Sequence, residues 1–313
     1  MTHIRSKPLV TVIIPTYNNA KYIGEAIESV LKQTYRNFEL IVVDDGSTDK
    51  TREALDPYIN KNQIKYIYQN NKKQGAARNN GIKHAQGELI ALLDSDDLWL
   101  PEKLELQVPL FIDKKVELVY AGVMKFSDKD NRIVKTTNFE KCFKGYIFDN
   151  LFNNDKSFIP NSSAVIRKSC LEEIDSINVS GPYWEDLSCV TSEDYHFFLK
   201  LTHKFKADYV PKHLVRYRLH DTNSSKDTIK NLMSAIAITK NISSLYNIPV
   251  KRTRMKISRY YLSIGYNYRK TSKLKALNYY FKSMRYHIRF EHFKLIVALL
   301  SSSCLRSFKT VFL

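Results

Sequence analysis

A run of three carboxylates and one hydroxyl, at residues 94–97, has the composition of a cation site. It directly follows a nearly unbroken apolar segment, residues 88–93. Crowded carboxylates repel one another. Their charge must therefore be stabilised by a cation, by hydrogen-bond donors or by open solvent. A hard divalent cation such as Mg²⁺ or Mn²⁺ takes oxygen ligands and keeps positions vacant for phosphate oxygens. The alternative is a solvated acidic loop that begins a helix at Pro101, with Asp97 or a neighbour as its cap.

The segments around this run predict an open α/β sheet. Residues 88–93, preceded by Gly87, are typical of a strand buried on both faces of a parallel sheet. Further strands are expected at Leu9–Ile14, Phe38–Val43 and Ile64–Tyr68, with helices at 23–31 and at Gly75–Ala85. Strands that alternate with helices through short loops predict right-handed parallel crossovers. Ligands of such sheets bind beyond the carboxyl ends of the strands, where the acidic run stands.

A second acidic pair, Asp44 and Asp45, ends the second strand and precedes Gly46. Both acidic sites therefore emerge at the same edge of the sheet. One can accept hydrogen bonds from the base or ribose of a nucleotide while the other holds a metal against its diphosphate. Ser47 or Thr48 is placed to cap the next helix. The chain has neither the glycine-rich dinucleotide fingerprint nor the P-loop pattern, so a metal must supply what those loops give to a phosphate.

The second half of the chain is less regular. We expect a mobile or acceptor-facing region at 127–157, and helices rich in Lys, Arg and Tyr from about Ile229, with no repeat established there. The remaining expected elements are a helix at Pro101–Asp113, a strand at Glu117–Phe126, a strand at Ser162–Arg167, a helix at Glu193–His203 and a strand at Tyr209–Arg218.

Charge is distributed unevenly along the 313 residues. From Ser225 to the end the chain holds 18 Lys and Arg against 2 Asp and Glu, and before it 31 against 30. Such a tail suggests an electrostatic partner, either nucleic acid or an anionic membrane surface. With 43% hydrophobic and 12% aromatic residues the chain has ample material for a folded core, which excludes a disordered protein.

Cysteine usage and the chain ends predict a compartment. Four scattered cysteines show no metal spacing and are too few for a disulfide framework, so reduced thiols are expected. They are Cys142, Cys170, Cys189 and Cys304. The segment before Pro8 lacks the apolar core of a signal peptide, and the apolar run Leu295–Leu300 is far shorter than the roughly 20 residues of a spanning helix. We therefore expect a cytosolic protein, or one bound to the cytosolic face of a membrane.

Four blocks of the sequence resemble the family 2 glycosyltransferases of GT-A fold. They match in order and at the family's usual spacing, and the resemblance covers roughly residues 8–220. The blocks are Ile13–Asn19, Val43–Asp49, Ala77–Gly81 and Leu93–Asp97. The resemblance implies a Rossmann-like, mostly parallel sheet flanked by helices, followed here by a basic helical region. It also implies a nucleotide-diphosphate-sugar donor and a divalent cation, Mn or Mg, as cofactor.

In the family, the first two blocks bind the nucleoside. The resemblance places Tyr17 and the backbone of Pro15 in the base pocket. It also implies that Asp45 accepts a hydrogen bond from the base, which favours uracil or thymine. Asp45 could otherwise merely begin the turn that follows its strand.

The later blocks imply contacts to the diphosphate and the metal. Asp94 is expected near the ribose or the sugar, Asp96 on the metal, and Asp97 as an orienting residue or helix cap. Lys73 and Arg78 fall where the family contacts the diphosphate or the sugar. Either of them could instead pair with a surface carboxylate.

Three further segments resemble the family's active-site motifs. Glu193 and Asp194 match its Glu-Asp pair, in which Asp194 is the expected base and Glu193 orients it or binds the acceptor. Two acids in the first turn of a helix are also ordinary dipole chemistry. Arg218 and His220 match the final segment, where either can meet the diphosphate or the metal, and a structural histidine is the alternative. Around Trp184 the sequence departs from the family's Gly-x-Phe-Asp-Glu pattern, and this residue could stack on an acceptor sugar.

These features predict an inverting glycosyltransferase. It would move a sugar from a nucleotide diphosphate donor, UDP- or dTDP-linked, onto a glycan or lipid-linked acceptor in cell-surface polysaccharide synthesis. Residues 1–224 would form the catalytic domain and 225–313 the basic helical region. One alternative is a metal-dependent nucleotidyltransferase, which would not explain the Glu-Asp pair. Another is a nucleic-acid-binding protein that uses the basic tail, but no recognised binding motif supports it. The intact acidic set disfavours an inactive scaffold.

Overall fold

The computed structural model describes residues 7–154, 158–175, 193–221, 223 and 228–299. Contacts within the chain group into two compact units. The first unit contains the sheet and extends to Asn223. The second unit continues from Ser224 and, where it is described, is helical.

One half of the sheet is parallel, with the strand order β3-β2-β1-β4. Its strands are β1 (Val10–Thr16), β2 (Phe38–Asp44), β3 (Lys65–Tyr68) and β4 (Leu89–Leu92). β1 lies between β2 and β4 and is buried along its whole length, as expected for a strand covered on both faces. Thr16 pairs with Asp44, so the ends of β1 and β2 emerge together at one edge. The predicted α/β sheet is confirmed.

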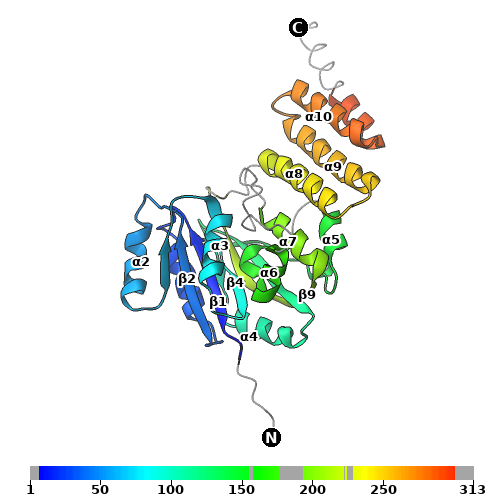
Figure 1. Ribbon diagram of the computed structural model, residues 1–313. Helices are drawn as coiled ribbons and strands as arrows, with labels where there is room; N and C mark the ends of the chain where they lie inside the picture. Colours follow the sequence, from blue (N-terminus) through cyan, green and yellow to red (C-terminus); the bar gives the residue numbers. More distant parts are fainter. Residues whose placement is uncertain (1–6, 155–157, 176–192, 222, 224–227, 300–313) are drawn as a thin grey trace, which may run out of the picture. The chain divides into compact units, whose positions relative to one another are not determined.

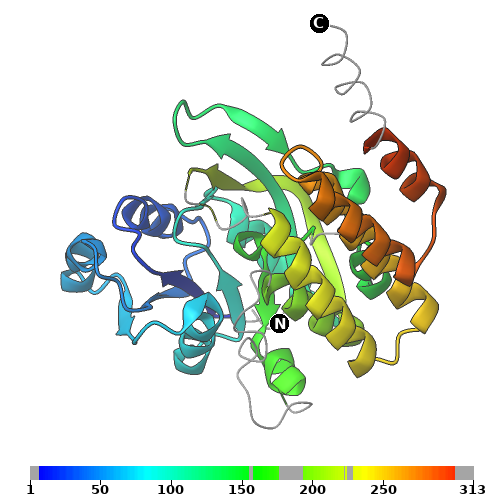
Figure 2. The ribbon, with the colours of Figure 1, turned by 90° about the horizontal axis from the view of Figure 1, so that it is seen from above.

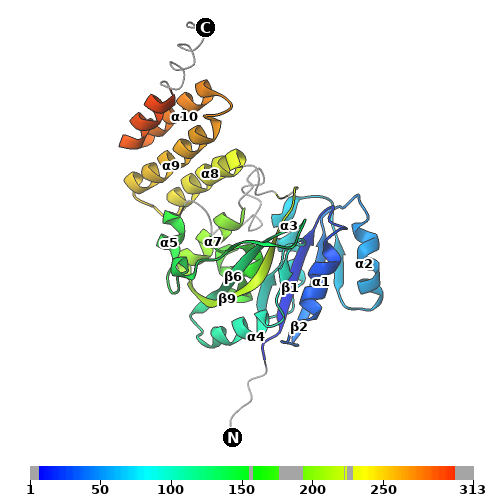
Figure 3. The same cartoon turned by 180° about the vertical axis from the view of Figure 1, so that it is seen from behind.

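Helices cover both faces of this parallel half. They are α1 (Ile23–Leu31), α2 (Thr51–Asn60) and α3 (Lys73–His84). Val12 and Ile14 of β1 belong to the same apolar cluster as the buried face of α1. Ile13 points to the other face, where Gly81 of α3 approaches it. Figure 1 shows α3 in front of the strands, and Figure 3 shows α1 from behind.

The other half of the sheet is mixed and continues in the order β4-β8-β6-β9-β5, with β7 paired to β6. β8 runs antiparallel to both β4 and β6, so β4 and β6 end at the same edge. Its elements are β5 (Leu98–Trp99), α4 (Lys103–Gln107), η1 (Val108–Ile112), β6 (Val116–Ser127), β7 (Ile133–Thr136), η2 (Phe139–Lys141), α5 (Phe148–Asn153), η3 (Asn161–Ser163), β8 (Val165–Arg167), α6 (Lys168–Asp175), α7 (Glu193–Lys204) and β9 (Lys206–Leu219).

Several element boundaries differ from the sequence prediction, and two of them concern segments near the acidic run. The helix expected at Pro101–Asp113 is a short α4 followed by the 3-10 helix η1, because Pro109 has no N–H to give to an α-helical hydrogen bond. The strand expected from Ser162 begins only at Val165, because residues 161–163 form η3.

The predicted cap of α2 is also wrong. Neither Ser47 nor Thr48 caps this helix; instead Asp49 accepts the backbone N–H of Thr51 at 2.9 Å. The Ser47 hydroxyl accepts the backbone N–H of Asn18 at 2.9 Å, which ties the loop after β2 to the loop after β1. Region 127–154 contains β7, η2 and α5, and its role toward an acceptor stays a prediction.

The second unit is an array of helices, as expected for the basic region. Its helices are α8 (Thr228–Leu245), α9 (Val250–Tyr268), α10 (Lys273–Tyr286) and a last helix at 290–299. Figures 1 and 3 show α8, α9 and α10 as successive neighbours, and Figure 2 shows the same helices from above. Within the described residues, no helix is long and apolar enough to cross a membrane.

We expect Gly81→Ala to lower the free energy of unfolding by about 1–3 kcal/mol, because an added Cβ overpacks the contact between α3 and β1. That Cβ would stand 2.5 Å from Cγ2 of Ile13, which is buried and branched. The matched control is Gly24→Ala in α1, where the Cβ would meet only the Tyr58 hydroxyl at 3.5 Å. Alanine favours a helix over glycine by up to about 1 kcal/mol, so the control gains stability. Urea denaturation measures both variants, and equal stabilities would contradict the packing argument.

Candidate active site

The acidic run at 94–97 is anchored by its last carboxylate. Asp97 is buried and accepts hydrogen bonds from Ser162 Oγ at 2.6 Å and from the backbone N–H of Arg218 at 3.0 Å. Burial, followed by the charges of the other two aspartates, raises the pKa of Asp97 well above its usual range. α4 begins without a side-chain cap, so the expected alternative of a helix cap is wrong. Asp97 instead joins the run to η3 and to β9.

Arg78 joins the acidic run to α7. Its side chain is completely buried, and its guanidinium donates to Asp94 at 2.6 Å, to Glu193 at 3.1 Å and to Gln74 at 3.3 Å. Arg78 therefore does pair with carboxylates, as the alternative expected, although both partners are half-buried. Its contact with a diphosphate or sugar stays a prediction. The two ion pairs fix the start of α7 beside the carboxyl end of β4.

Glu193 and Asp194 are the first two residues of α7. Asp194 is half-buried and accepts the backbone N–H of Tyr195 at 2.7 Å. Burial, followed by the negative charge of Glu193, raises the pKa of Asp194 to about 7. A helix N-terminus favours the ionised form of an acid, so ordinary dipole chemistry would move this pKa the other way. A carboxyl group with such a pKa can exchange protons near neutral pH.

Asp96 and His220 face each other at the same edge. Asp96 Oδ2 lies 2.8 Å from His220 Nε2, and Asn223 Nδ2 lies 3.4 Å from the same oxygen. Burial, followed by the charge of Asp94, raises the pKa of Asp96, so the ionised carboxylate is short of counter-charge. The carboxylate is a ligand that suits Mn²⁺ and Mg²⁺, and the imidazole beside it is a second donor.

The donor set around Asp96 is small enough to suit a cation shared with a substrate. In the part of the chain that the structure describes, no three His, Cys, Asp or Glu side chains converge as a metal site. Mg²⁺ in particular is usually bound through one or two carboxylates plus substrate phosphates and water. The pair of Asp96 and His220 therefore fits a cation that takes its remaining oxygens from a diphosphate.

Arg218 connects the acidic run to α1 and to the end of β6. Its Nε donates to the carbonyl of Asp96 at 2.9 Å, Nη1 to Asp128 at 2.8 Å and Nη2 to Glu25 at 2.8 Å. The ring of Tyr22 lies 4.7 Å from the guanidinium carbon. These contacts hold the Asp96 backbone against α1 and the end of β6. They favour a supporting role for Arg218, and its expected contact with the diphosphate stays a prediction.

The sequence interpretation missed Asp128 and Glu25. Asp128 also accepts from Lys21 at 2.7 Å and from the Tyr22 hydroxyl at 2.8 Å. Hydrogen bonds from Lys21 and Arg218 hold the pKa of Asp128 well below its usual range. Asp128 directly follows β6, so the rule that identified the other acidic sites, an acid just past a strand end, could have found it. Glu25 lies in the first turn of α1 and carries no such signal.

Asp45 lies where the nucleoside was expected. Its buried carboxylate accepts from Gln69 Nε2 and from the backbone N–H of Lys72, both at 2.8 Å. Burial raises the pKa of Asp45. The turn after β2 is made instead by Asp44, which accepts the backbone N–H of Ser47 at 2.9 Å. The alternative that Asp45 merely begins this turn is therefore wrong.

The other nucleoside and diphosphate candidates lie at the same strand ends. Pro15 is buried within β1, whereas Tyr17 just beyond it is 47% exposed. Lys73 is exposed at the start of α3, and its positive charge faces Asp45. Asn19 Nδ2 donates to Ser95 Oγ at 2.6 Å, which joins this loop to the acidic run. The expected acceptor residue Trp184 lies outside the described residues.

Comparison with known proteins identifies relatives of this chain. A profile described as "Glycosyl transferase family 2" matches residues 11–175. An uncharacterised glycosyltransferase of Rickettsia typhi is 33% identical over 72% of this chain and 68% of its own length. Another, from a Nostoc species, is 32% identical over 83% of this chain and 78% of its own length.

Solved structures share the fold. S. aureus TarS (1-349), in complex with UDP-GlcNAc, matches with a TM-score of 0.64 at 19% identity, over 88% of this chain and 81% of that chain. A mannosyltransferase from Pyrobaculum calidifontis, in complex with GDP-Man and Mn²⁺, matches with a TM-score of 0.56 at 17% identity, over 96% and 87%. The GT-A fold is thereby confirmed. From the family profile and the relatives, the chain belongs to glycosyltransferase family 2 and is an enzyme that transfers sugars.

Proposed function

We propose that this glycosyltransferase inverts the anomeric configuration as it transfers a sugar from a nucleotide diphosphate donor to a glycan or lipid-linked acceptor. The observation that carries the proposal is Asp194, a carboxyl with a pKa of about 7 beside the Arg78 bridge to the acidic run. The donor is UDP- or dTDP-linked, and a structural neighbour bound to UDP-GlcNAc supports a UDP donor. The pathway is cell-surface polysaccharide synthesis.

The donor lies along the ends of the parallel strands. The backbone of Pro15 and the exposed ring of Tyr17 line the base pocket, and Asp45 accepts a hydrogen bond from the base. Lys73 and Arg78 contribute positive charge toward the diphosphate and sugar, and Asp94 lies near the ribose. Buried Asp45 is held by two donors already, so its orientation is set before the base arrives.

Asp96 and His220 would hold the divalent cation, Mn²⁺ or Mg²⁺. When bound, this cation supplies positive charge to the departing diphosphate. The raised pKa of Asp96 reflects a half-buried carboxylate that lacks counter-charge, which a cation would provide. A structural neighbour in complex with GDP-Man and Mn²⁺ supports this choice of ion.

Asp194 takes the proton from the acceptor hydroxyl. The acceptor oxygen forms a bond to the anomeric carbon while the bond from that carbon to the diphosphate oxygen breaks, and the nucleoside diphosphate leaves with the electron pair. In an inverting transfer the attack comes from the face opposite the leaving group, so the base must differ from the carboxylates on the leaving side. Glu193, held by Arg78, orients Asp194 or binds the acceptor, and Trp184 stacks on the acceptor sugar.

We assign these roles to residues 1–224 and propose that 225–313 attaches the enzyme to an anionic membrane surface on the cytoplasmic side. Lipid-linked acceptors are found at such a surface. Family membership leaves the nucleotidyltransferase alternative without support. The nucleic-acid alternative rests on the charge of the tail alone.

Asp96→Ala should abolish Mn²⁺-dependent binding of UDP, because the variant loses the carboxylate of the cation pair. The variant should stay folded, since Asp96 is a half-buried carboxylate and the lost contact with His220 is offset by relief of the repulsion from Asp94. Isothermal titration of UDP with and without Mn²⁺ measures the effect. Asp130→Ala is the control, because Asp130 is an exposed loop carboxylate. Unchanged Mn²⁺ dependence in Asp96→Ala would remove this residue from the metal site.

Asp194→Asn should reduce turnover by about 10² to 10⁴ while leaving donor affinity nearly unchanged, because the variant cannot accept a proton. In the wild type, kcat/KM should rise with pH through about 7, since the base works only when ionised and its pKa is raised to about 7. Glu53→Gln, another acid in the first turn of a helix, is the control. Near-normal turnover of Asp194→Asn, or retained anomeric configuration by NMR, would disprove the assignment.

Asp128→Asn separates two roles of Arg218. If Arg218 acts by holding the Asp96 backbone, Asp128→Asn and Arg218→Lys should both weaken Mn²⁺-dependent UDP binding by about tenfold, which corresponds to roughly 1.4 kcal/mol. If Arg218 touches the diphosphate, only Arg218→Lys should do so. The control is Asp130→Asn, because Asp130 is an exposed acid two positions after Asp128. Wild-type UDP affinity in Asp128→Asn would refute the supporting role.

A further inference from the structure

We infer that the outer faces of α10 and of the helix at 290–299 form a surface that binds an anionic lipid bilayer. This inference rests on the proposed membrane attachment and names the residues that make it. The surface, called here the basic-apolar face, consists of Leu274, Phe281, Arg285, Ile288, Phe290, Phe293, Lys294 and Val297.

Large apolar side chains are unusually exposed in this unit. Nine of the fifteen exposed large hydrophobic residues of the described chain lie between 228 and 299. Leu274 is 80% exposed, Phe290 72% and Val297 63%. Scattered exposed apolar residues are normal, but a concentration of them indicates an interaction site.

The exposed apolar residues lie on the sides of the helices that face away from the core. In α10, Leu274, Phe281 and Arg285 recur at intervals of seven and four residues, so they share one face. Phe290, Phe293 and Val297 share a face of the last helix in the same way. The buried residues Ala276, Tyr280 and Leu299 instead belong to one apolar cluster, against which Leu262 and Tyr268 of α9 also pack. The residues of the exposed faces are therefore not part of the apolar core of the unit.

The charge around these faces indicates which partner binds them. Between 228 and 299 the sequence has fifteen Lys and Arg against one acidic residue, Glu291. A second copy of the chain would bring the same excess of positive charge and would be repelled. An anionic bilayer attracts basic residues and also accepts aromatic and aliphatic side chains at the boundary between headgroups and acyl chains.

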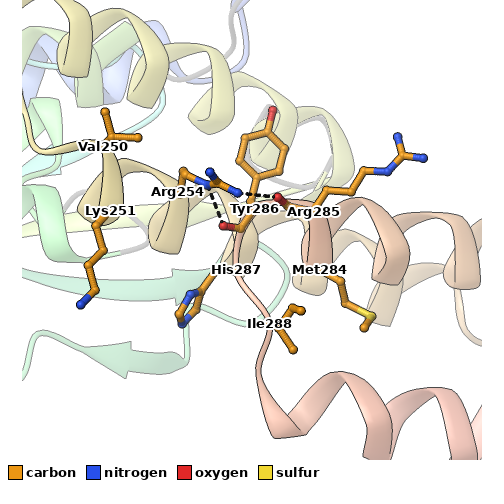
Figure 4. A pocket seen from close by; sticks show the side chains of 8 residues that line it. All are labelled: Val250, Lys251, Arg254, Met284, Arg285, Tyr286, His287 and Ile288. Carbon is orange, nitrogen blue, oxygen red and sulfur yellow. Dashed lines mark hydrogen bonds between the residues drawn. The ribbon is translucent and has the colours of Figure 1, made fainter.

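A cleft beside Ile288 offers a place for a lipid phosphate. It has a volume of about 680 Å³ and lies between the start of α9 and the end of α10. Arg254 shapes it by donating Nε to the carbonyl of Tyr286 at 3.0 Å and Nη2 to the carbonyl of Arg285 at 2.8 Å. Figure 4 shows these two bonds with Lys251 nearby. Lys251, Arg254 and Arg285 line this cleft, and basic pockets between transmembrane helices bind anionic headgroups through the same kind of charge.

The scaffold of the face is a helical hairpin formed by α9 and α10. Tyr261, Ile264, Gly265 and Tyr268 of α9 have the spacing of the first helix of a tetratricopeptide unit, and Ala276 and Tyr280 of α10 that of the second. A Cβ on Gly265 would stand 2.5 Å from the ring of Tyr280, so the two helices need this glycine to pack. Such hairpins also bind proteins, which makes a protein partner the competing outcome. The bilayer is favoured because the apolar residues stand exposed on outer faces among basic side chains.

Vesicle flotation with the full chain tests the inference. The wild type should float with vesicles of phosphatidylcholine and phosphatidylglycerol and not with phosphatidylcholine alone, and added salt should weaken the binding. Phe290→Ser/Phe293→Ser should weaken it by about tenfold or more, because two aromatic side chains no longer enter the bilayer. The matched control is Ile112→Ser/Val134→Ser, which removes two residues of similar exposure from the first unit. Arg285→Ser/Lys294→Ser should lower binding to anionic vesicles, whereas Lys50→Ser/Lys61→Ser should not.

Equal recovery with neutral and anionic vesicles would overturn the inference, as would wild-type flotation of Phe290→Ser/Phe293→Ser. Binding to DNA that exceeds binding to anionic vesicles would also overturn it. The thermal midpoint checks that each variant is folded. UDP binding by the same variants separates this result from the proposed reaction. If a variant no longer binds vesicles but still binds UDP, the defect lies in the second unit. If a variant loses turnover but still floats with vesicles, only the proposed catalysis is contradicted.

Discussion

The buried guanidinium of Arg78 is the interaction on which the site depends. A charge without solvent is tolerated only if it is paired, and here the partners are Asp94 at the end of β4 and Glu193 at the start of α7. These residues lie 16 and 115 positions from Arg78 in the chain, so one side chain joins three segments that share no local structure. Removing one partner of a buried pair typically costs about 3–5 kcal/mol, because the other charge stays buried. The sheet edge and the proposed base are thereby held in one arrangement.

The same edge contains more negative than positive charge. Arg78 and Arg218 are each engaged by carboxylates, yet burial and mutual repulsion still raise the pKa values of Asp96, Asp97 and Asp194. The excess has two chemical uses. Near Asp96 it makes a bound cation favourable, and at Asp194 it produces a carboxyl group that can take up a proton near neutral pH. One electrostatic condition thus supports both the metal site and the base that we propose.

Local patterns predicted the parallel strands and the acids at their ends, because both depend on short-range spacing. The positions of Asp45, Asp94 and Asp96 just past strand ends were therefore predicted from the chain alone. The support of Asp96 was not, because Arg218 reaches Glu25 across 193 positions and Asp128 across 90, and no periodicity encodes such contacts. The helix expected from Pro101 was interrupted because Pro109 withholds a single hydrogen-bond donor. The role of Trp184 stays a prediction, since it lies outside the described residues.

The positive charge of the chain is concentrated in the second unit, whereas the proposed catalytic residues lie in the first. Before Ser225 the chain is nearly balanced, with 31 basic against 30 acidic residues, whereas the remainder holds 18 against 2. The long-range attraction to an anionic surface that we propose would therefore act mainly on the second unit, and it would fall off within a Debye length. The donor site works at short range, through buried groups such as Asp45 and Arg78, which salt screens much less. In the enzyme that we propose, the basic second unit would supply the attraction to the anionic surface, while the nearly balanced residues before Ser225 contain the carboxylates on which the chemistry depends.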